Sequence, residues 1–140
     1  MKLGKGTAKW LAVLLAVLAA YWFGLRGDPR VEALNQAIQA QGSPALKSYP
    51  YPFGVVGVEG SVAVMSTPRS SAMPVYRMIR AIDPSLSGKA ADNPDFVAAE
   101  KALAKVQTEA RQIVLAQPGV SEVKWELDRN WLVSHQITLD

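Results

Sequence analysis

The sequence predicts an α+β fold, in which one N-terminal transmembrane helix precedes a small domain of helices packed on an antiparallel or mixed sheet. A run of 16 residues without a charged side chain, from Trp10 to Leu25, predicts the transmembrane helix. Beyond it, some stretches repeat apolar residues at helical spacing and others alternate them, with proline and glycine between the stretches. We therefore expect the domain to follow the order α-β-β-α-α-β-β.

The uncharged run fits a membrane span that basic side chains extend at both ends. As a helix it is about 24 Å long, whereas the hydrocarbon core of a bilayer is about 30 Å thick. Lys9 and Arg26 can add length by reaching toward the interfaces. Interfacial aromatic residues complete the predicted membrane anchor, namely Trp10 at one end and Tyr21, Trp22 and Phe23 at the other.

The distribution of charge predicts the orientation of the chain. Three lysines precede the run, and the two arginines that follow it most closely are balanced by acids. The positive-inside rule then gives a cytoplasmic basic leader at 1–9, a transmembrane helix at 10–26 and a periplasmic domain at 27–140. The short leader and the alanine-rich composition suit a bacterial inner-membrane protein.

A cleaved signal peptide is the alternative to an anchor. Val17-Leu18-Ala19 is an acceptable cleavage site after an apolar core. The apolar run nevertheless continues through Phe23, whereas signal cores usually stop at the cleavage site. This continuation favours an uncleaved anchor.

Small residues recur every four positions along the run. They are Ala12, Ala16, Ala20 and Gly24. Such a ridge lets two helices approach closely in a membrane, although alanine is also simply common in helices of this kind. Both interpretations are open.

The composition of the remaining chain limits its partners and its chemistry. From Gly27 onward the sequence contains eleven Lys or Arg residues and twelve Asp or Glu residues. This near-neutral domain lacks the basic surplus that nucleic-acid binding requires, so we expect no nucleic acid as a partner. The chain contains no cysteine, which excludes disulfides, thiolate nucleophiles and cysteine metal sites.

The first half of the domain is predicted from helix and turn signals. Asp28-Pro29 begins a helix that ends at Gln41, before Gly42-Ser43-Pro44. Residues 43–54, with three prolines among aromatic residues, indicate a polyproline-like connector that covers the core edge or binds a partner. Residues 55–66 indicate a β-hairpin with Gly60 in its turn.

The next segments join the hairpin to a long helix. A short helix is expected over 74–82, and the segment 84–93 is expected to be a mobile loop. Asn93-Pro94 begins the longest helix of the domain, which runs to about Ala116. One apolar seam marks its packed face, formed by Phe96, Ala99, Leu103, Val106, Ala110 and Ile113.

Two strands are expected to end the chain. Val123, Trp125 and Leu127 alternate with charged residues and predict a half-buried strand. After a turn at 128–130, a final strand is expected from Trp131 to Leu139, with His135 on its apolar face. Together these strands would form a second hairpin.

The order of three segments resembles the BON domain of bacterial envelope proteins. The matching segments are VEALNQAIQA at 31–40, VVGVEGSVAVMS at 55–66 with Gly60 in the turn, and QPGVSEVKWEL at 117–127 with Gly119, Val120 and Val123. The resemblance as a whole extends over about two thirds of the domain. The resemblance implies a non-catalytic module that contacts phospholipid surfaces or envelope partners. Two departures are the insertion at 67–92 and the additional strand from Trp131.

The residues needed for catalysis or for a cofactor do not form a recognisable set. His135 is the only histidine, and no serine motif places a base beside a nucleophile, so we expect no enzyme and no cofactor. Copper(I) is a minor alternative, because thioether and imidazole groups are suitable ligands. Its candidate ligands are Met65, Met73, Met78 and His135, although core packing also explains the methionines.

One segment of the domain is locally basic. It contains Arg69, Arg77, Arg80 and Lys89. Arg77 and Arg80 would share a helix face and could contact anionic lipid or a partner, the alternative being an ordinary solvated face.

These observations predict a non-catalytic accessory or assembly subunit of a bacterial envelope membrane complex. Its expected partners are membrane lipid and other membrane-protein subunits, in a hetero-complex or a homodimer. The alternative is a BON-like module that binds phospholipid at the outer face of the inner membrane, and the third reading is a periplasmic copper-handling factor.

Overall fold

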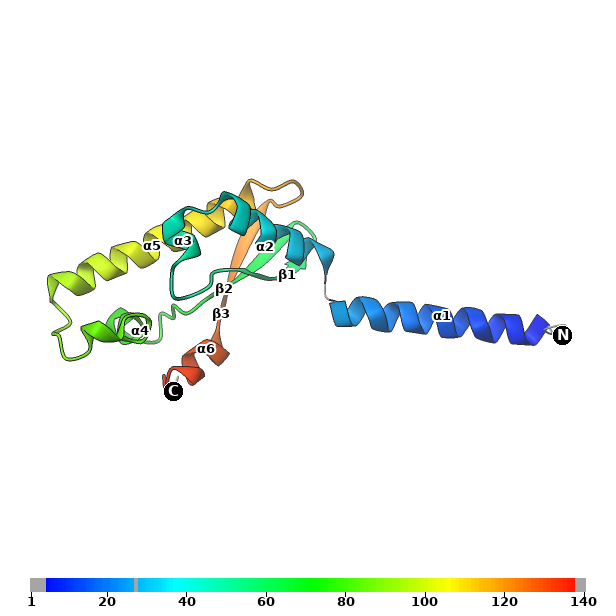
Figure 1. Ribbon diagram of the computed structural model, residues 1–140, viewed down its shortest axis with the longest axis horizontal. Helices are drawn as coiled ribbons and strands as arrows, with labels where there is room; N and C mark the ends of the chain where they lie inside the picture. The colour runs from blue at the N-terminus through cyan, green and yellow to red at the C-terminus, as the bar shows by residue number, and fades with distance from the viewer. Residues whose placement is uncertain (1–4, 27, 138–140) are drawn as a thin grey trace.

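A three-stranded sheet forms the centre of the computed structural model, which describes residues 5–26 and 28–137 (Figure 1). For residues 5 and 19–26 it describes the backbone alone. Strand β1 (Val55–Glu59) pairs antiparallel with β2 (Val62–Thr67), and β2 pairs parallel with β3 (Glu122–Leu127). The predicted α+β class is confirmed, and the sheet is mixed.

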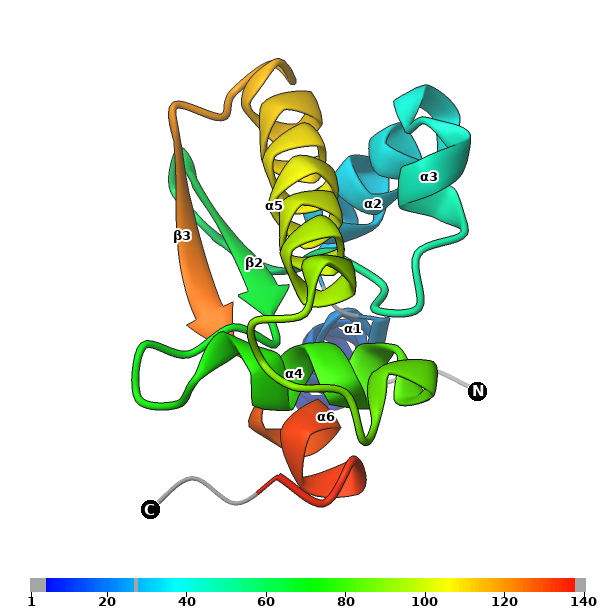
Figure 2. The same ribbon diagram turned by 90° about the vertical axis from the view of Figure 1, so that its left-hand side faces the viewer.

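Helices cover one face of this sheet (Figure 2). Helix α2 (Pro29–Gln41) packs on β1 and on α5 (Pro94–Leu115), which also contacts β2 and β3. The short helix α3 (Pro44–Lys47) lies against α5. At the other end of α5 are α4 (Val75–Ile82) and the 3-10 turn η1 (Pro84–Leu86), and the chain ends in α6 (Arg129–Ser134).

The core lies between the sheet and the helices. Met65 from β2, Leu103 and Val114 from α5, and Ile38 from α2 are almost fully buried there. Tyr51 from the connector and Leu132 from α6 are also fully buried and extend the core past the end of β3. Burial of such apolar side chains is the main source of stability in a domain without disulfides.

Local signals explain where most elements begin and end. Asp28 caps α2 by accepting a hydrogen bond from the Arg30 N–H at 2.9 Å, with Pro29 at the first helical position. This bond and a second one from the Arg30 side chain lower the pKa of Asp28. Gly60 has φ +61° in the hairpin turn and Gly119 has φ +83° between α5 and β3, a conformation that other residues rarely adopt.

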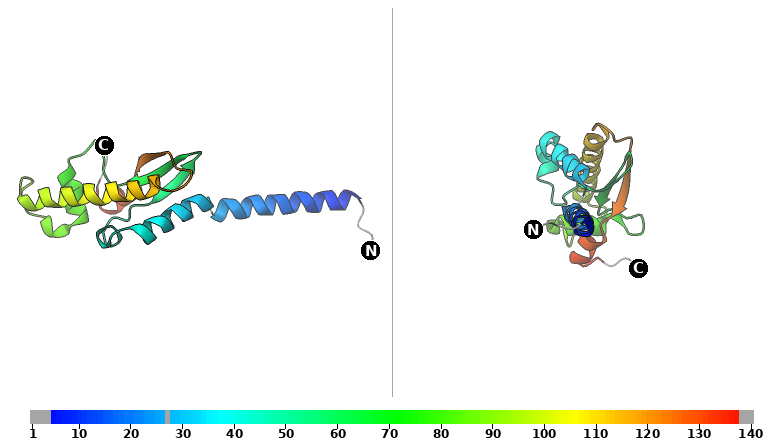
Figure 3. Two further views of the ribbon diagram at one scale, coloured as in Figure 1. Left: turned by 90° about the horizontal axis from the view of Figure 1, so that it is seen from above. Right: turned by 90° about the vertical axis from the view of Figure 1, so that its right-hand side faces the viewer.

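Helix α1 (Lys5–Arg26) contains the uncharged run and extends away from the domain (Figures 1 and 3). Within the described residues, no helix combines the length and the apolarity that crossing a membrane requires. This finding corrects the predicted transmembrane helix at 10–26 and, with it, the single-pass accessory subunit of a membrane complex.

Two other segments differ from their predicted structure. Residues 129–134 form α6 and not a strand, because the Asp128 carboxylate caps a helix there by accepting from the Trp131 N–H at 3.0 Å. The observed order therefore ends in a helix where a strand was predicted. Residues 138–140 of the expected strand lie outside the described residues. The connector at 43–54 begins with α3, which Ser43 caps through the Leu46 N–H.

Candidate functional site at the free edge of the sheet

At one position of the edge formed by β1, Val55, a side chain imitates a neighbouring strand. The Val55 N–H donates to Asn35 Oδ1 at 2.7 Å, and Asn35 Nδ2 donates to the Val55 carbonyl at 3.0 Å. The amide of Asn35 on α2 thus makes the pair of bonds that an antiparallel neighbour would make. The register also shifts between Val55 and Gly57. Such irregular, covered edges do not accept a further strand.

The other edge, at β3, has backbone groups that point away from the sheet. The Ser66 N–H donates to the Gly54 carbonyl at 3.0 Å, on the β1 side, and the Asp128 N–H donates to the Thr67 carbonyl at 2.8 Å. Even-numbered residues of β2 therefore bond to β1, and its odd-numbered residues bond to β3. In the parallel register, these odd-numbered residues of β2 bond to the even-numbered residues of β3. The outward-facing groups are the N–H and C=O of Val123, Trp125 and Leu127.

These outward-facing groups have no hydrogen-bond partner within residues 5–26 and 28–137. In both end-on views, β3 lies at the outer margin of the domain (Figures 2 and 3). A row of unpaired N–H and C=O groups on an exposed edge is a template for another strand. We call β3 the free edge.

The side chains of the free edge form two different rows. Glu122, Lys124 and Glu126 are exposed on the face of the sheet that the helices leave open. Val123, Trp125 and Leu127 are partly buried against the core. The predicted half-buried strand is confirmed. Its open face presents the sequence acid, base, acid at alternate positions.

Hydrogen bonds fix the free edge at both ends. Before β3, the Ser121 N–H donates to the Ser61 carbonyl at 2.9 Å, and the two hydroxyls lie 2.7 Å apart. After β3, the Asp128 carboxylate accepts from the Trp131 N–H and, at 2.9 Å, from the Tyr51 hydroxyl. The strand is therefore held extended before any partner binds, which lowers the entropy lost on binding.

Aromatic residues of the connector support β3 from the core side. The Tyr51 ring meets the Trp131 ring edge to face at 5.3 Å, and Phe53 meets Trp125 at 6.3 Å. Burial raises the pKa of Tyr51 above its ordinary range and that of Tyr49 to about 12, so both phenols stay protonated at neutral pH. Of the two predicted roles for this connector, the contacts match cover for the core edge.

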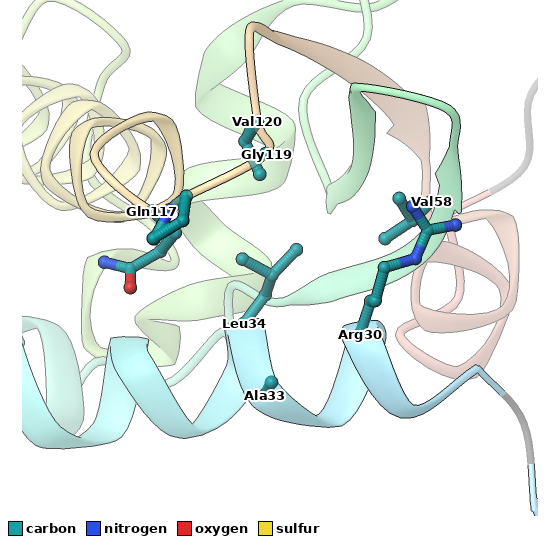
Figure 4. Close-up of a pocket in the computed structure, with 8 residues that line it drawn as sticks. Arg30, Ala33, Leu34, Val58, Gln117, Gly119 and Val120 are labelled. Atoms are coloured by element: carbon teal, nitrogen blue, oxygen red, sulfur yellow. The ribbon is translucent and has the colours of Figure 1, made fainter.

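A small hollow lies between α2, β1 and the loop after α5 (Figure 4). Its volume is about 190 Å³, and Leu34, Val58 and Val120 form apolar walls. The polar side chains at its rim already make hydrogen bonds and an ion pair within the protein. Arg30 donates to the Gly60 carbonyl at 3.0 Å and pairs with Asp28, and Gln117 donates to the Ile113 carbonyl. The hollow is thus a packing gap between these elements.

Two members of the predicted basic patch, Arg80 and Lys89, also make contacts within the domain. The Arg80 guanidinium lies over the rings of Tyr76 and Phe96, at 5.0 and 5.4 Å, and donates to the Lys89 carbonyl. The Lys89 ammonium pairs with Asp95 at 2.6 Å. These contacts hold the segment between α4 and α5 in place. Arg69 and Arg77 are exposed, and they alone keep the character of the predicted patch.

The structure describes part of the predicted anchor and helix ridge. On α1, Trp10 is 72% exposed, and Ala12 and Ala16 are exposed as well. The remaining members lie within α1, but their side chains are outside the described residues: Ala20, Tyr21, Trp22, Phe23 and Gly24. An interfacial role for the aromatic residues and a packing role for the ridge both stay predictions.

The candidate copper ligands differ in burial. Met65, Met73 and Met78 are buried in the hydrophobic core. His135 lies at the exposed end of α6, where its ring stacks on Trp131 at 3.9 Å and its Nδ1 is 2.7 Å from the Trp131 carbonyl oxygen. Over the described part of the chain, no three His, Asp or Glu residues are placed to hold a metal ion. The copper-handling reading is corrected.

Sequence reasoning missed the free edge because it assigned β3 a hairpin partner. The signal that could have identified the error is Asp128, a residue favoured at helix starts, three positions before Trp131. Asn35 was missed as well. No sequence signal connects it to Val55, which is twenty positions away along the chain.

Comparisons with known proteins do not add to this geometry. No protein-family model, curated protein or solved structure matches the chain. The candidate site is therefore defined by the hydrogen bonds and side chains of β3 itself.

Proposed function

We propose that the domain is a non-catalytic protein-binding module that adds an extended protein segment to its sheet along β3. The observation that carries this proposal is the row of three unpaired N–H and C=O pairs at Val123, Trp125 and Leu127. When a strand is added to a sheet, backbone hydrogen bonds supply affinity and alternate side chains supply specificity. At the opposite edge, Asn35 already occupies the backbone N–H and C=O of Val55.

The side chains of the free edge define the chemistry of the segment. An antiparallel segment with the pattern base, acid, base on the open face would oppose Glu122, Lys124 and Glu126. Apolar residues between those charges would cover the partly buried row that includes Trp125. We therefore expect a short, extended segment with alternating charges and β-branched residues.

Two further observations support a binding role over a catalytic one. Polar side chains with catalytic potential are engaged in structural contacts, as when Glu109 accepts from the Ser43 N–H and hydroxyl, at 3.2 and 2.9 Å. Asp128 and His135 are similarly engaged. In addition, α2, the β1–β2 hairpin, α5 and β3 come in the order on which the BON resemblance is based, with α3, α4 and η1 between them.

Amide hydrogen exchange tests this proposal, on the full chain at dilutions where sedimentation detects only single copies. The probe is the designed peptide TKVEVKT, which has the complementary charge pattern. The amides of Val123, Trp125 and Leu127 should gain protection when the peptide is added, whereas those of Lys124 and Glu126 should be protected throughout. The charge-reversed peptide TEVKVET is the matched control and should protect the outward amides less. Unchanged exchange at all three outward amides under excess TKVEVKT would overturn the proposal.

A further inference from the structure

The segment that fits the free edge can be found in this chain. We propose that a second copy supplies it, so that two β3 strands pair antiparallel about a two-fold axis at Trp125 and the two sheets become one. This inference rests on the proposed function, because it names the partner of the same edge. Three features of β3 specify the pairing.

The first feature is the backbone. Only odd-numbered residues of β3 present free N–H and C=O groups, so an antiparallel pair must join odd to odd. Centred on Trp125, the pair matches Trp125 with itself and Val123 with Leu127. All three outward pairs of each copy are then bonded. A shift by two positions places one of them beyond the end of the other strand.

The second feature is the charge on the open face. The same register puts Lys124 of each copy directly opposite Glu126 of the other. A register centred on Lys124 would oppose two lysines, and one centred on Glu126 would oppose two glutamates. A lysine on an edge usually discourages pairing. Here the acid two positions away makes the edge self-complementary.

One contact in this register joins two acids, Glu122 and Asp128. The Asp128 carboxylate does not face outward, because it accepts from the Tyr51 hydroxyl at 2.9 Å and from the Trp131 N–H at 3.0 Å. Those bonds hold it toward the core and the first turn of α6. It therefore opposes Glu122 only weakly.

The third feature is that pairing stops at two copies. The two-fold pair uses both free edges, so the combined sheet ends in β1 on each side. Asn35 occupies the backbone of Val55 at each of those ends. The arrangement thus gives a closed dimer, in which each copy also covers the partly buried Trp125 of the other.

Disulfide trapping with the full chain tests the register. The chain has no cysteine, so an introduced one is a unique probe. Lys124→Cys and Glu126→Cys chains are mixed and oxidised, since facing residues at a non-hydrogen-bonded site have Cα atoms about 4.5 Å apart, within disulfide range. We expect the mixed disulfide to exceed either self-linked product by about tenfold or more. Dominant self-linking of either variant, or no linking at all, would overturn the inference.

Charge exchange tests the same pairing in solution by analytical ultracentrifugation. Lys124→Glu and Glu126→Lys should each weaken self-association by about tenfold, because each opposes like charges twice. Mixing the two variants should restore association, since one strand is then acidic where the other is basic. Lys101→Glu, on the exposed side of α5, is the control and should change nothing. Association through α1 cannot reproduce this pattern. Self-association that persists at full strength in both single variants would therefore contradict the β3 pairing.

Two outcomes separate this inference from the proposed function. If the chain stays monomeric but TKVEVKT still protects the outward amides, strand addition stands and the second copy is excluded. If the chain stays monomeric and the peptide protects nothing, both proposals are wrong.

Discussion

The two edges of the sheet are treated in opposite ways. At β1, Asn35 bonds to both backbone groups of Val55, and α2 packs alongside. At β3, three successive backbone pairs are unoccupied, although Ser121 and Asp128 fix the strand at its two ends. An exposed edge promotes unwanted association unless it is blocked or used. This difference is the basis on which we propose a partner for the β3 edge.

The contrast lies in the backbone and not in the packing. Phe53, just before β1, contacts Trp125 of β3 at 6.3 Å, so both edges share one aromatic cluster beneath the sheet. Val55 is buried, and Trp125 is partly buried. Removing the bonds of Asn35 at β1 should consequently lower the stability of the fold. Changing the exposed side chains of β3 should instead weaken association.

The largest expected effect is at the end of β3. Asp128→Ala removes the cap of α6 and leaves the buried Tyr51 hydroxyl without its acceptor. The free energy of unfolding should fall by about 2–4 kcal/mol, from the lost cap and the unsatisfied hydroxyl. Chemical denaturation of the full chain measures this change, with Asp92→Ala in an exposed loop as the control.

A second substitution tests the stated cause of that loss. Tyr51→Phe in the Asp128→Ala chain removes the unsatisfied hydroxyl, so it should recover part of the lost stability. If the double variant is less stable than Asp128→Ala alone, the Tyr51 hydroxyl does not depend on Asp128, and β3 is not anchored in this way.

The next largest effect is expected at Asn35, whose bonds to Val55 distinguish the β1 edge from the β3 edge. Asn35→Ala deletes both bonds to Val55 and should lower stability by about 1–3 kcal/mol, because partly buried groups lose their partners. Hydrogen exchange at the Val55 amide should become faster. Gln36→Ala, at the next and exposed position of α2, is the control. A Val55 amide that stays protected in the Asn35→Ala chain would show that other groups cover this edge.

Elements with local signals could be predicted from the sequence. Asp28 and Asn93 are N-caps followed by proline, and they locate the starts of α2 and α5. Gly60 in the turn likewise identifies the β1–β2 hairpin. In each case, residues within a few positions determine the backbone conformation, so the prediction needs no tertiary contact.

Elements that depend on distant contacts could not be predicted in this way. Helix α3 is tied to α5 through Ser43 and Glu109, which are 66 positions apart. The pairing of β3 with β2, rather than with the residues after it, depends on a parallel register that no local pattern specifies. The free edge follows from that register, and its role could therefore be recognised only from the fold.

A smaller effect appears only at alkaline pH and concerns the connector beneath β3. Burial raises the pKa of Tyr49 from 10.0 to about 12, so the folded chain retains a proton that the unfolded chain loses. The contribution of Tyr49 to stability should be constant below pH 10 and should fall as the pH rises toward 12. Denaturation midpoints across this range measure the fall, which Tyr49→Phe should reduce. An equal fall in that variant would assign it to other groups.

The smallest expected effect completes the contrast between the edges. Lys124 is exposed on the open face of β3, so Lys124→Glu should change the unfolding free energy of a single copy by less than about 0.5 kcal/mol. Denaturation must be measured at dilutions where sedimentation detects only single copies, because association would add its own stabilisation. A loss above about 1 kcal/mol would mean that Lys124 supports the fold. A negligible loss, together with weakened self-association, would mean that the side chains of β3 act on a partner, whereas Asn35 at β1 acts on the fold.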